Sequence, residues 1–119
     1  MKTKLILISI FLIFISAFAA AQSRNVTASI KVYGNCGMCK KRIETALDHK
    51  GVKLASWDTK TKELRIVYNS DKVSELQIHE LVASAGHDTD KVKAKDEVYA
   101  ALPFCCLYRD HAHDGKDNH

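Results

Sequence analysis

Four cysteines are the residues of this chain best suited to chemistry, and they occur as two tight pairs. Cys36 and Cys39 are separated by two residues, whereas Cys105 and Cys106 are adjacent. Disulfides are common in small exported proteins, but a disulfide between adjacent residues is strained. The spacing therefore favours chelation of a metal ion or redox chemistry over structural cross-links.

The first pair stands where a helix is expected to begin. Free backbone N–H groups and the positive end of the helix dipole favour thiolate over thiol, so Cys36 and Cys39 should ionise more readily than isolated cysteine. Two soft ligands with no histidine or carboxylate nearby suit an ion of low coordination number, Cu(I) above all, whereas structural zinc requires four ligands. The cations that follow, Lys40, Lys41 and Arg42, either dock an acidic partner or form a solvated helix face.

The elements that must position these cysteines are visible in the apolar pattern. A period of two predicts four strands, the last with the weakest alternation. They cover residues 27–33, 52–57, 64–68 and 89–94.

Helical spacing predicts two helices between these strands. The first runs from about Met38 to Gly51, and the second is capped by Ser70 or Asp71 and ends at Gly86. The resulting order, βαββαβ, predicts an α+β, ferredoxin-like sandwich followed by a short C-terminal extension.

The first 21 residues predict export. They combine Lys2 and Lys4, a long apolar run and the small residues 19–21, which is the pattern of a cleaved signal peptide. The apolar run is shorter than the ~20 residues of a spanning helix, so we expect no membrane insertion after cleavage. The protein is therefore expected outside the cytoplasm, and in the periplasm if it comes from a Gram-negative bacterium.

The charge balance gives no indication of nucleic acid binding. The 119 residues carry 18 basic and 14 acidic side chains, for a formal net charge of +4. Without Lys2 and Lys4, 16 basic side chains remain against the same 14 acidic ones. A nucleic-acid-binding domain usually has a much stronger excess of positive charge.

The segment Tyr33 to Glu44, which reads YGNCGMCKKRIE, resembles the metal-binding loop of the heavy-metal-associated domain family. This family includes copper chaperones, soluble domains of metal-pumping ATPases and periplasmic mercury-binding proteins, and its fold has the element order expected above. The resemblance implies that Cys36 and Cys39 are the metal ligands. It divides the chain into a signal peptide (1–21), a heavy-metal-associated domain (22–95) and a Cys- and His-containing tail (96–119).

Two positions depart from the family pattern. Members usually have Met two residues before the first cysteine, packed beneath the loop, but this chain has Gly34 there and Met38 between the cysteines. We expect Met38 to be a loop or packing residue. Members also commonly have Tyr, Phe or Lys after the second helix, where this chain has His87. If the first and last strands are neighbours, His87 faces the cysteines and is either a third ligand, a hydrogen-bond donor to sulfur or an exposed turn residue.

The second cysteine pair lies beyond the segment that resembles the family. Ten residues beyond Lys95 span about 33 Å when extended, which is enough to return to the first pair. Cys105 and Cys106 are therefore additional ligands at the same site, ligands of a separate site with His111 and His113, inert buried residues or a dimer contact.

We expect a protein that is not an enzyme, and that transfers or sequesters Cu(I) by exchange of thiolate ligands. A mercury(II) scavenger is one alternative, with Zn(II) and Cd(II) behind, and a recognition module with a structural metal is another. A thiol-disulfide oxidoreductase uses the same CxxC spacing, but Trp is absent before Cys36 and the only proline is Pro103. The expected partner is a metal-transporting membrane protein or another metal-handling protein, with the chain a monomer or a metal-bridged dimer.

Overall fold

β3 (Glu63–Asn69) is the central strand of a three-stranded antiparallel sheet, in the order β1-β3-β2. The other two strands are β1 (Asn25–Lys31) and β2 (Val52–Trp57). Leu64 and Ile66 alternate with exposed residues along β3 and are buried, as their period of two predicts. The structure, a computed structural model, describes residues 24–110. The predicted signal peptide (1–21), His111 and His113 lie outside these residues.

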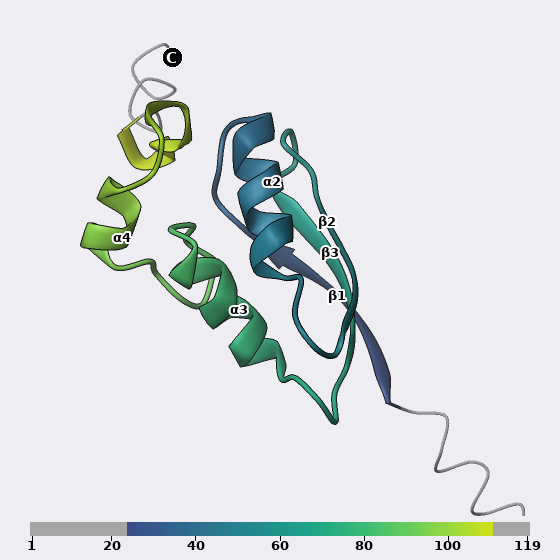
Figure 1. Cartoon of the computed structure of the whole chain (residues 1–119). Coiled ribbons are helices and arrows are strands. Elements are labelled where there is room, and N and C mark those ends of the chain that lie inside the picture. The colour runs from purple at the N-terminus through teal and green to yellow at the C-terminus, as the bar shows by residue number, and fades with distance from the viewer. Residues whose placement is uncertain (1–23, 111–119) are drawn as a thin grey trace, which may run out of the picture.

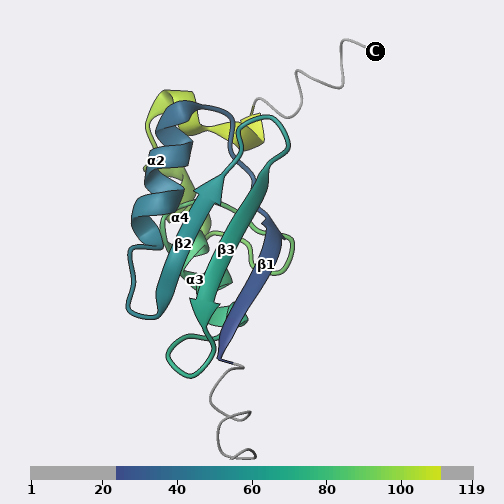
Figure 2. The ribbon, with the colours of Figure 1, turned by 90° about the vertical axis from the view of Figure 1, so that its right-hand side faces the viewer.

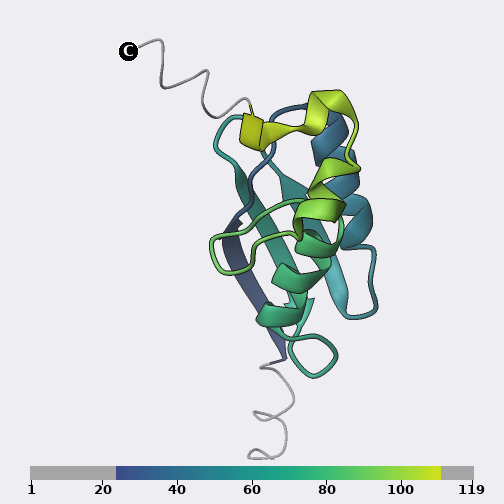
Figure 3. The ribbon, with the colours of Figure 1, turned by 90° about the vertical axis from the view of Figure 1, so that its left-hand side faces the viewer.

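Two helices cover one face of the sheet (Figure 1). They are α2 (Gly37–Ala46) and α3 (Glu75–Ser84). Figure 2 looks onto the opposite face of the sheet, and Figure 3 looks onto the helices. The core lies between the two layers and contains fully buried side chains of both, among them Ile43, Leu47, Leu64, Ile66, Ile78 and Val82. The predicted α+β fold is therefore confirmed.

The second helix begins one turn later than the sequence predicts. Its N-cap is Ser74, whose hydroxyl accepts a hydrogen bond from the Gln77 N–H at 3.1 Å. The Gln77 side chain accepts one from the Ser74 N–H at 2.8 Å, which completes a capping box. The expected caps, Ser70 and Asp71, instead lie in the turn that follows β3.

The expected last strand, residues 89–94, is reduced in the structure to one antiparallel bridge between Val32 and Thr89. The Thr89 N–H donates to the Val92 carbonyl at 2.8 Å, and the Val92 N–H donates to the Thr89 hydroxyl at 2.9 Å. These local bonds close a turn, which prevents the segment from continuing along β1. The bridge nevertheless places the turn after α3 beside the end of β1, as the expected strand order predicts.

After this turn the chain runs back toward the start of α2 (Figure 3). It forms α4 (Asp96–Ala100) and a 3-10 helix, η1 (Phe104–Cys106), which contacts α2. Gly86 permits the return, because it has a φ of +102° and a Cβ there would lie 2.8 Å from a methyl carbon of Leu102. Within residues 24–110, none of the helices is long and apolar enough to cross a membrane.

Candidate metal centre

The CxxC loop forms the beginning of α2. Cys36 is the N-cap residue, with extended backbone angles, and Cys39 lies in the first helical turn. The two Sγ atoms are 3.1 Å apart. Asn35 holds the inner sulfur from the preceding loop: its N–H lies 3.5 Å from Cys39 Sγ, and its side-chain oxygen accepts a hydrogen bond from that thiol at 3.1 Å. The loop therefore directs both sulfurs toward one point.

Cys106 adds a third sulfur to this point. Its Sγ lies 3.7 Å from Cys36 Sγ, and the sulfurs of Cys36, Cys39 and Cys106 all lie within 4.8 Å of one another. Cys39 and Cys106 are fully buried, whereas Cys36 is partly exposed. Of the residues considered as additional ligands, Cys106 is the one that the structure brings into this group. We call these residues the three-cysteine centre.

The three thiols differ in acidity. Burial alone would raise the pKa of Cys36, but hydrogen bonds from the Cys39 thiol and N–H, together with the Cys106 and Cys105 thiols, lower it to about 7. Burial raises the pKa of Cys39 despite the Asn35 N–H, and burial raises that of Cys106 as well. The expectation that both cysteines of the loop ionise easily is thus met by Cys36 and is wrong for Cys39, because desolvation outweighs the helix start there.

Gly34 has a steric reason to depart from the family pattern. The Trp57 indole fills the space beneath the loop and donates its Nε1–H to the Val32 carbonyl at 3.0 Å. A Cβ on Gly34 would lie 3.0 Å from the Trp57 ring and 3.1 Å from the Cys39 Cβ. Trp57 is fully buried and supports the loop from β2.

His87 lies beside the loop, as expected, but it is not part of the three-cysteine centre. It is fully buried and donates its Nδ1–H to the Tyr33 carbonyl at 2.8 Å. Burial lowers the pKa of His87, which favours the neutral ring. The His87 ring also stacks on the Tyr108 ring, with 5.3 Å between the ring centroids. In this structure His87 joins the end of β1 to the C-terminal segment.

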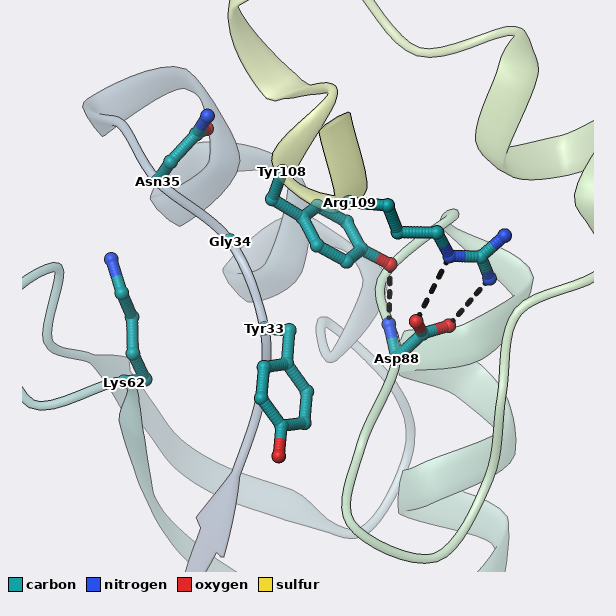
Figure 4. A pocket seen from close by; sticks show the side chains of 7 residues that line it. All are labelled: Tyr33, Gly34, Asn35, Lys62, Asp88, Tyr108 and Arg109. Carbon is teal, nitrogen blue, oxygen red and sulfur yellow. Dashed lines mark hydrogen bonds and ion pairs between the residues drawn. The ribbon is translucent and has the colours of Figure 1, made fainter. Parts of the chain in front are cut away.

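The segment after η1 is fastened to the turn after α3 (Figure 4). Arg109 forms two charged hydrogen bonds to the Asp88 carboxylate, at 3.0 and 2.8 Å. The Tyr108 hydroxyl donates to the Gly86 carbonyl at 2.9 Å and accepts from the Asp88 N–H at 2.7 Å. We call Asp88, Tyr108 and Arg109 the latch. It holds the chain two residues beyond Cys106.

These latch residues were not among the site residues predicted from the sequence. The available signal was the apolar run 104–108 followed by Arg109, which indicates packing but does not identify what it packs against. For Asp88, the sequence indicates only that a helix ends just before it, at Gly86. Their pairing depends on how the tail returns, which is a tertiary feature.

Lys40, the first of the three cations, is engaged within the fold. It forms an ion pair with Glu44 and donates to the Trp57 carbonyl at 3.0 Å. The Glu44 carboxylate in turn accepts from the Trp57 N–H at 3.0 Å. Lys40 therefore ties α2 to the end of β2, and Lys41 remains exposed on the helix surface.

The chain resembles known metal-binding proteins. Residues 35–88 match the Heavy-metal-associated domain family. The structure resembles the CopZ metallochaperone, with 27% identity and a TM-score of 0.52 over 54% of this chain and 98% of the other. It also resembles the N-terminal domain of a potential copper-translocating P-type ATPase from Bacillus subtilis in the Cu(I)-loaded state, with 25% identity and a TM-score of 0.52 over 55% and 84%.

A third similar structure supports the fold alone. Oxidized MerP from Ralstonia metallidurans CH34 has 20% identity and a TM-score of 0.53, over 56% of this chain and 94% of the other. No curated protein sequence matches the chain. The family match includes the CxxC loop, and the structural matches each cover about half of the chain.

Proposed function

We propose that this chain is a non-enzymatic metal-binding protein that carries Cu(I) on three thiolates, two of them those of Cys36 and Cys39, in the segment 35–88 that matches the Heavy-metal-associated domain family. The third is that of Cys106. The observation that supports this most directly is the convergence of the three sulfurs within 4.8 Å of one another. Thiolate is the soft ligand that Cu(I) prefers.

The spacing of the sulfurs favours three-coordinate binding over linear binding. With metal–thiolate bonds of ~2.3 Å, three sulfurs in a plane around an ion lie ~4.0 Å apart, and two collinear ones lie ~4.6 Å apart. The observed distances are 3.1 Å from Cys36 to Cys39 and 3.7 Å from Cys36 to Cys106. A small outward movement of Cys39 or Cys36 produces the trigonal arrangement, whereas a linear pair requires a larger one.

Transfer then proceeds by ligand exchange. A thiolate of the partner bonds to the ion as one of the three protein thiolates leaves, so the coordination number stays near three and no electron is transferred. Cys36 is the partly exposed member of the centre and is the one that an incoming thiolate reaches first. A metal-transporting ATPase is the partner class that we propose, because similar structures include a domain of a potential copper-translocating ATPase.

We further propose that this function is performed outside the cytoplasm. The support is the signal-like pattern of residues 1–21. Mass spectrometry of the protein isolated from its host should give a mature N-terminus at Gln22. An intact Met1 on the isolated protein would contradict export by this route.

Anaerobic Cu(I) titration of the reduced protein, against a chromophoric Cu(I) chelator, tests the three-cysteine centre. Cys36→Ser combined with Cys39→Ser should abolish tight binding of the first equivalent. Cys106→Ser should weaken it by 10- to 100-fold or more, because losing a direct ligand costs at least as much as losing a supporting contact. X-ray absorption should count three Cu–S bonds in the native protein and two in Cys106→Ser.

Cys105→Ser is the matched control, because it removes a neighbouring thiol and leaves the three ligands in place. Unchanged Cu(I) affinity without Cys36 and Cys39 would refute the proposal. The same titration with Hg(II), Cd(II) and Zn(II) ranks the metals, and a preference for Hg(II) in direct competition would favour the scavenger alternative.

One observation favours thiol-disulfide exchange as a second candidate function. Cys36 has a pKa lowered to about 7, and its sulfur lies 3.1 Å from that of Cys39. A low-pKa thiol beside a second thiol is the arrangement of a redox pair. Catalytic turnover in insulin reduction by the metal-free protein would support this candidate, and turnover no faster than that of Cys36→Ser would exclude it.

A further inference from the structure

Two exposed sulfur-containing residues lie beside the three-cysteine centre and are not among its three cysteines. Met38, in the first turn of α2, is 51% exposed, and Cys105, in η1, is also exposed. The Cys105 Sγ lies 3.4 Å from the Met38 Sδ, although the two residues are 67 apart in the sequence. We call Met38 and Cys105 the outer pair.

The exposure of Met38 argues against a purely packing role. A methionine that fills a gap in a core is normally buried. Met38 instead lines an open groove of about 510 Å³, together with Arg42 and Pro103. The Met38 side chain is therefore accessible to solvent, and the tertiary structure places its sulfur against the Cys105 thiol.

The outer pair continues into the centre through a row of sulfurs. Cys105 Sγ lies 3.9 Å from Cys106 Sγ, which in turn lies 3.7 Å from Cys36 Sγ. Since Cys39 and Cys106 are fully buried, an ion reaches the centre either at Cys36 or along this row. Each step in the row is shorter than the ~4.6 Å between two sulfurs that share one ion linearly.

We propose that Met38 and Cys105 form an outer Cu(I) site that loads the three-cysteine centre and, once the centre is full, holds a second ion. This inference rests on the proposed function. On binding, Cu(I) displaces the Cys105 thiol proton to solvent and accepts the Met38 thioether. On passing inward, the ion bonds to Cys106, whose thiol proton goes to solvent, as the bond to Met38 breaks. The bond to Cys105 breaks next, and that thiolate takes up a proton from solvent, so copper remains Cu(I) throughout. The transfer is favourable because three thiolates bind Cu(I) more tightly than one thiolate and a thioether.

Selenomethionine labelling tests the outer site directly, since Met38 is the only methionine among residues 24–110. Labelled protein is loaded anaerobically with one and then two equivalents of Cu(I) and examined by X-ray absorption at the selenium edge. A selenium–copper distance should be absent at one equivalent and present at two. The Met38→Leu variant, which retains any label at Met1, serves as the blank.

Titration and stopped-flow loading provide the second measurement. Met38→Leu and Cys105→Ser should each keep the first equivalent, lose the second and load the first several-fold more slowly. Cys105→Met, which restores a soft donor, should recover the second equivalent. If both removals leave the second equivalent and the loading rate unchanged, or if selenium shows no copper neighbour at two equivalents, the outer site is wrong. Loss of the first equivalent depends on Cys36 and Cys39 instead, so the two proposals fail separately.

Discussion

At the scale of single residues, Cys36 and Cys39 show that the same side chain acquires different chemistry over three positions. Both belong to the start of one helix, yet the pKa of Cys36 is lowered to about 7 and that of Cys39 is raised. Cys39 is fully buried against the core, whereas Cys36 is partly exposed and accepts hydrogen bonds from its neighbours. In the proposed transfer, Cys36 is therefore the thiolate that exchanges and Cys39 is the one that stays bound.

Gly34 provides a test at this scale. Gly34→Ala should lower the free energy of unfolding of the metal-free protein by about 1–3 kcal/mol, because the new Cβ overpacks Trp57 and the Cys39 Cβ. Gly37→Ala is the matched control, since a Cβ there meets nothing within 4 Å, and it should change that free energy by no more than about 0.5 kcal/mol. Urea unfolding measures both variants. Equal stability of the two would contradict the role assigned to Trp57.

At the scale of elements, the C-terminal segment depends on tertiary contacts. α4 has five residues and η1 has three, which is too short for either to be stable alone. Arg109 compensates by pairing with Asp88 and by lying over the Tyr99 ring, 4.3 Å from its centroid. We therefore expect the latch to help keep Cys106 at the three-cysteine centre.

The latch predicts a pH dependence. Burial alone would raise the pKa of Asp88, but hydrogen bonds from Arg109 and the Ala94 N–H lower it below the ordinary value. A carboxylate whose pKa is lowered by folding stabilises the fold above its unfolded pKa of about 3.9, and this contribution disappears as pH falls through the folded pKa. Asp88→Asn should therefore cost about 1–3 kcal/mol at pH 7 and converge with the native protein at low pH.

Urea unfolding at a series of pH values, with Cu(I) affinity measured at pH 7, checks this prediction. The affinity of Asp88→Asn should fall toward that of Cys106→Ser. Asp96→Asn is the control, because Asp96 also pairs with Arg109 but its side chain is 86% exposed and the bridge contributes little. Parallel stability curves for native protein and Asp88→Asn down to pH 2 would contradict the assigned role.

At the scale of the whole molecule, the tail and the metal-binding domain share one core. Tyr99, Leu102 and Tyr108 are buried in the same cluster as Ile43 and Val82. The Tyr99 and Tyr108 rings pack edge to face with 5.2 Å between centroids. The C-terminal extension is thus part of the folded unit, and it brings the Cys106 sulfur to the loop cysteines.

Shortening the chain tests whether the C-terminal extension is part of the core. A protein that ends at Lys95 should unfold at a lower urea concentration, because it exposes the apolar surface that Leu102 and Tyr108 cover, and its Cu(I) should have two Cu–S bonds. A protein that ends at Asp110 should retain the native midpoint and three Cu–S bonds. An unchanged midpoint for the shorter protein would mean that the tail is not integrated into the core.

The sequence alone identified the fold class, the CxxC loop at the start of a helix and a family resemblance, because all three are local patterns of spacing and periodicity. β2 was predicted with the observed bounds, and β1 and β3 to within two residues. The position of the second helix cap was wrong, and the last strand is a single bridge, because side-chain hydrogen bonds of Ser74 and Thr89 decide those boundaries.

Only the tertiary structure decided among Cys105, Cys106 and His87. All three were candidates for one site: chain length permitted Cys105 and Cys106 to reach it, and the expected strand order placed His87 beside it. In the structure, Cys106 lies with the loop cysteines and Cys105 lies beside Met38. His87 instead forms a hydrogen bond to the backbone carbonyl of Tyr33. The reason is the return of the tail, which a pairing between residues 21 apart, Asp88 and Arg109, fixes in place. Such a contact leaves no periodic trace in the sequence.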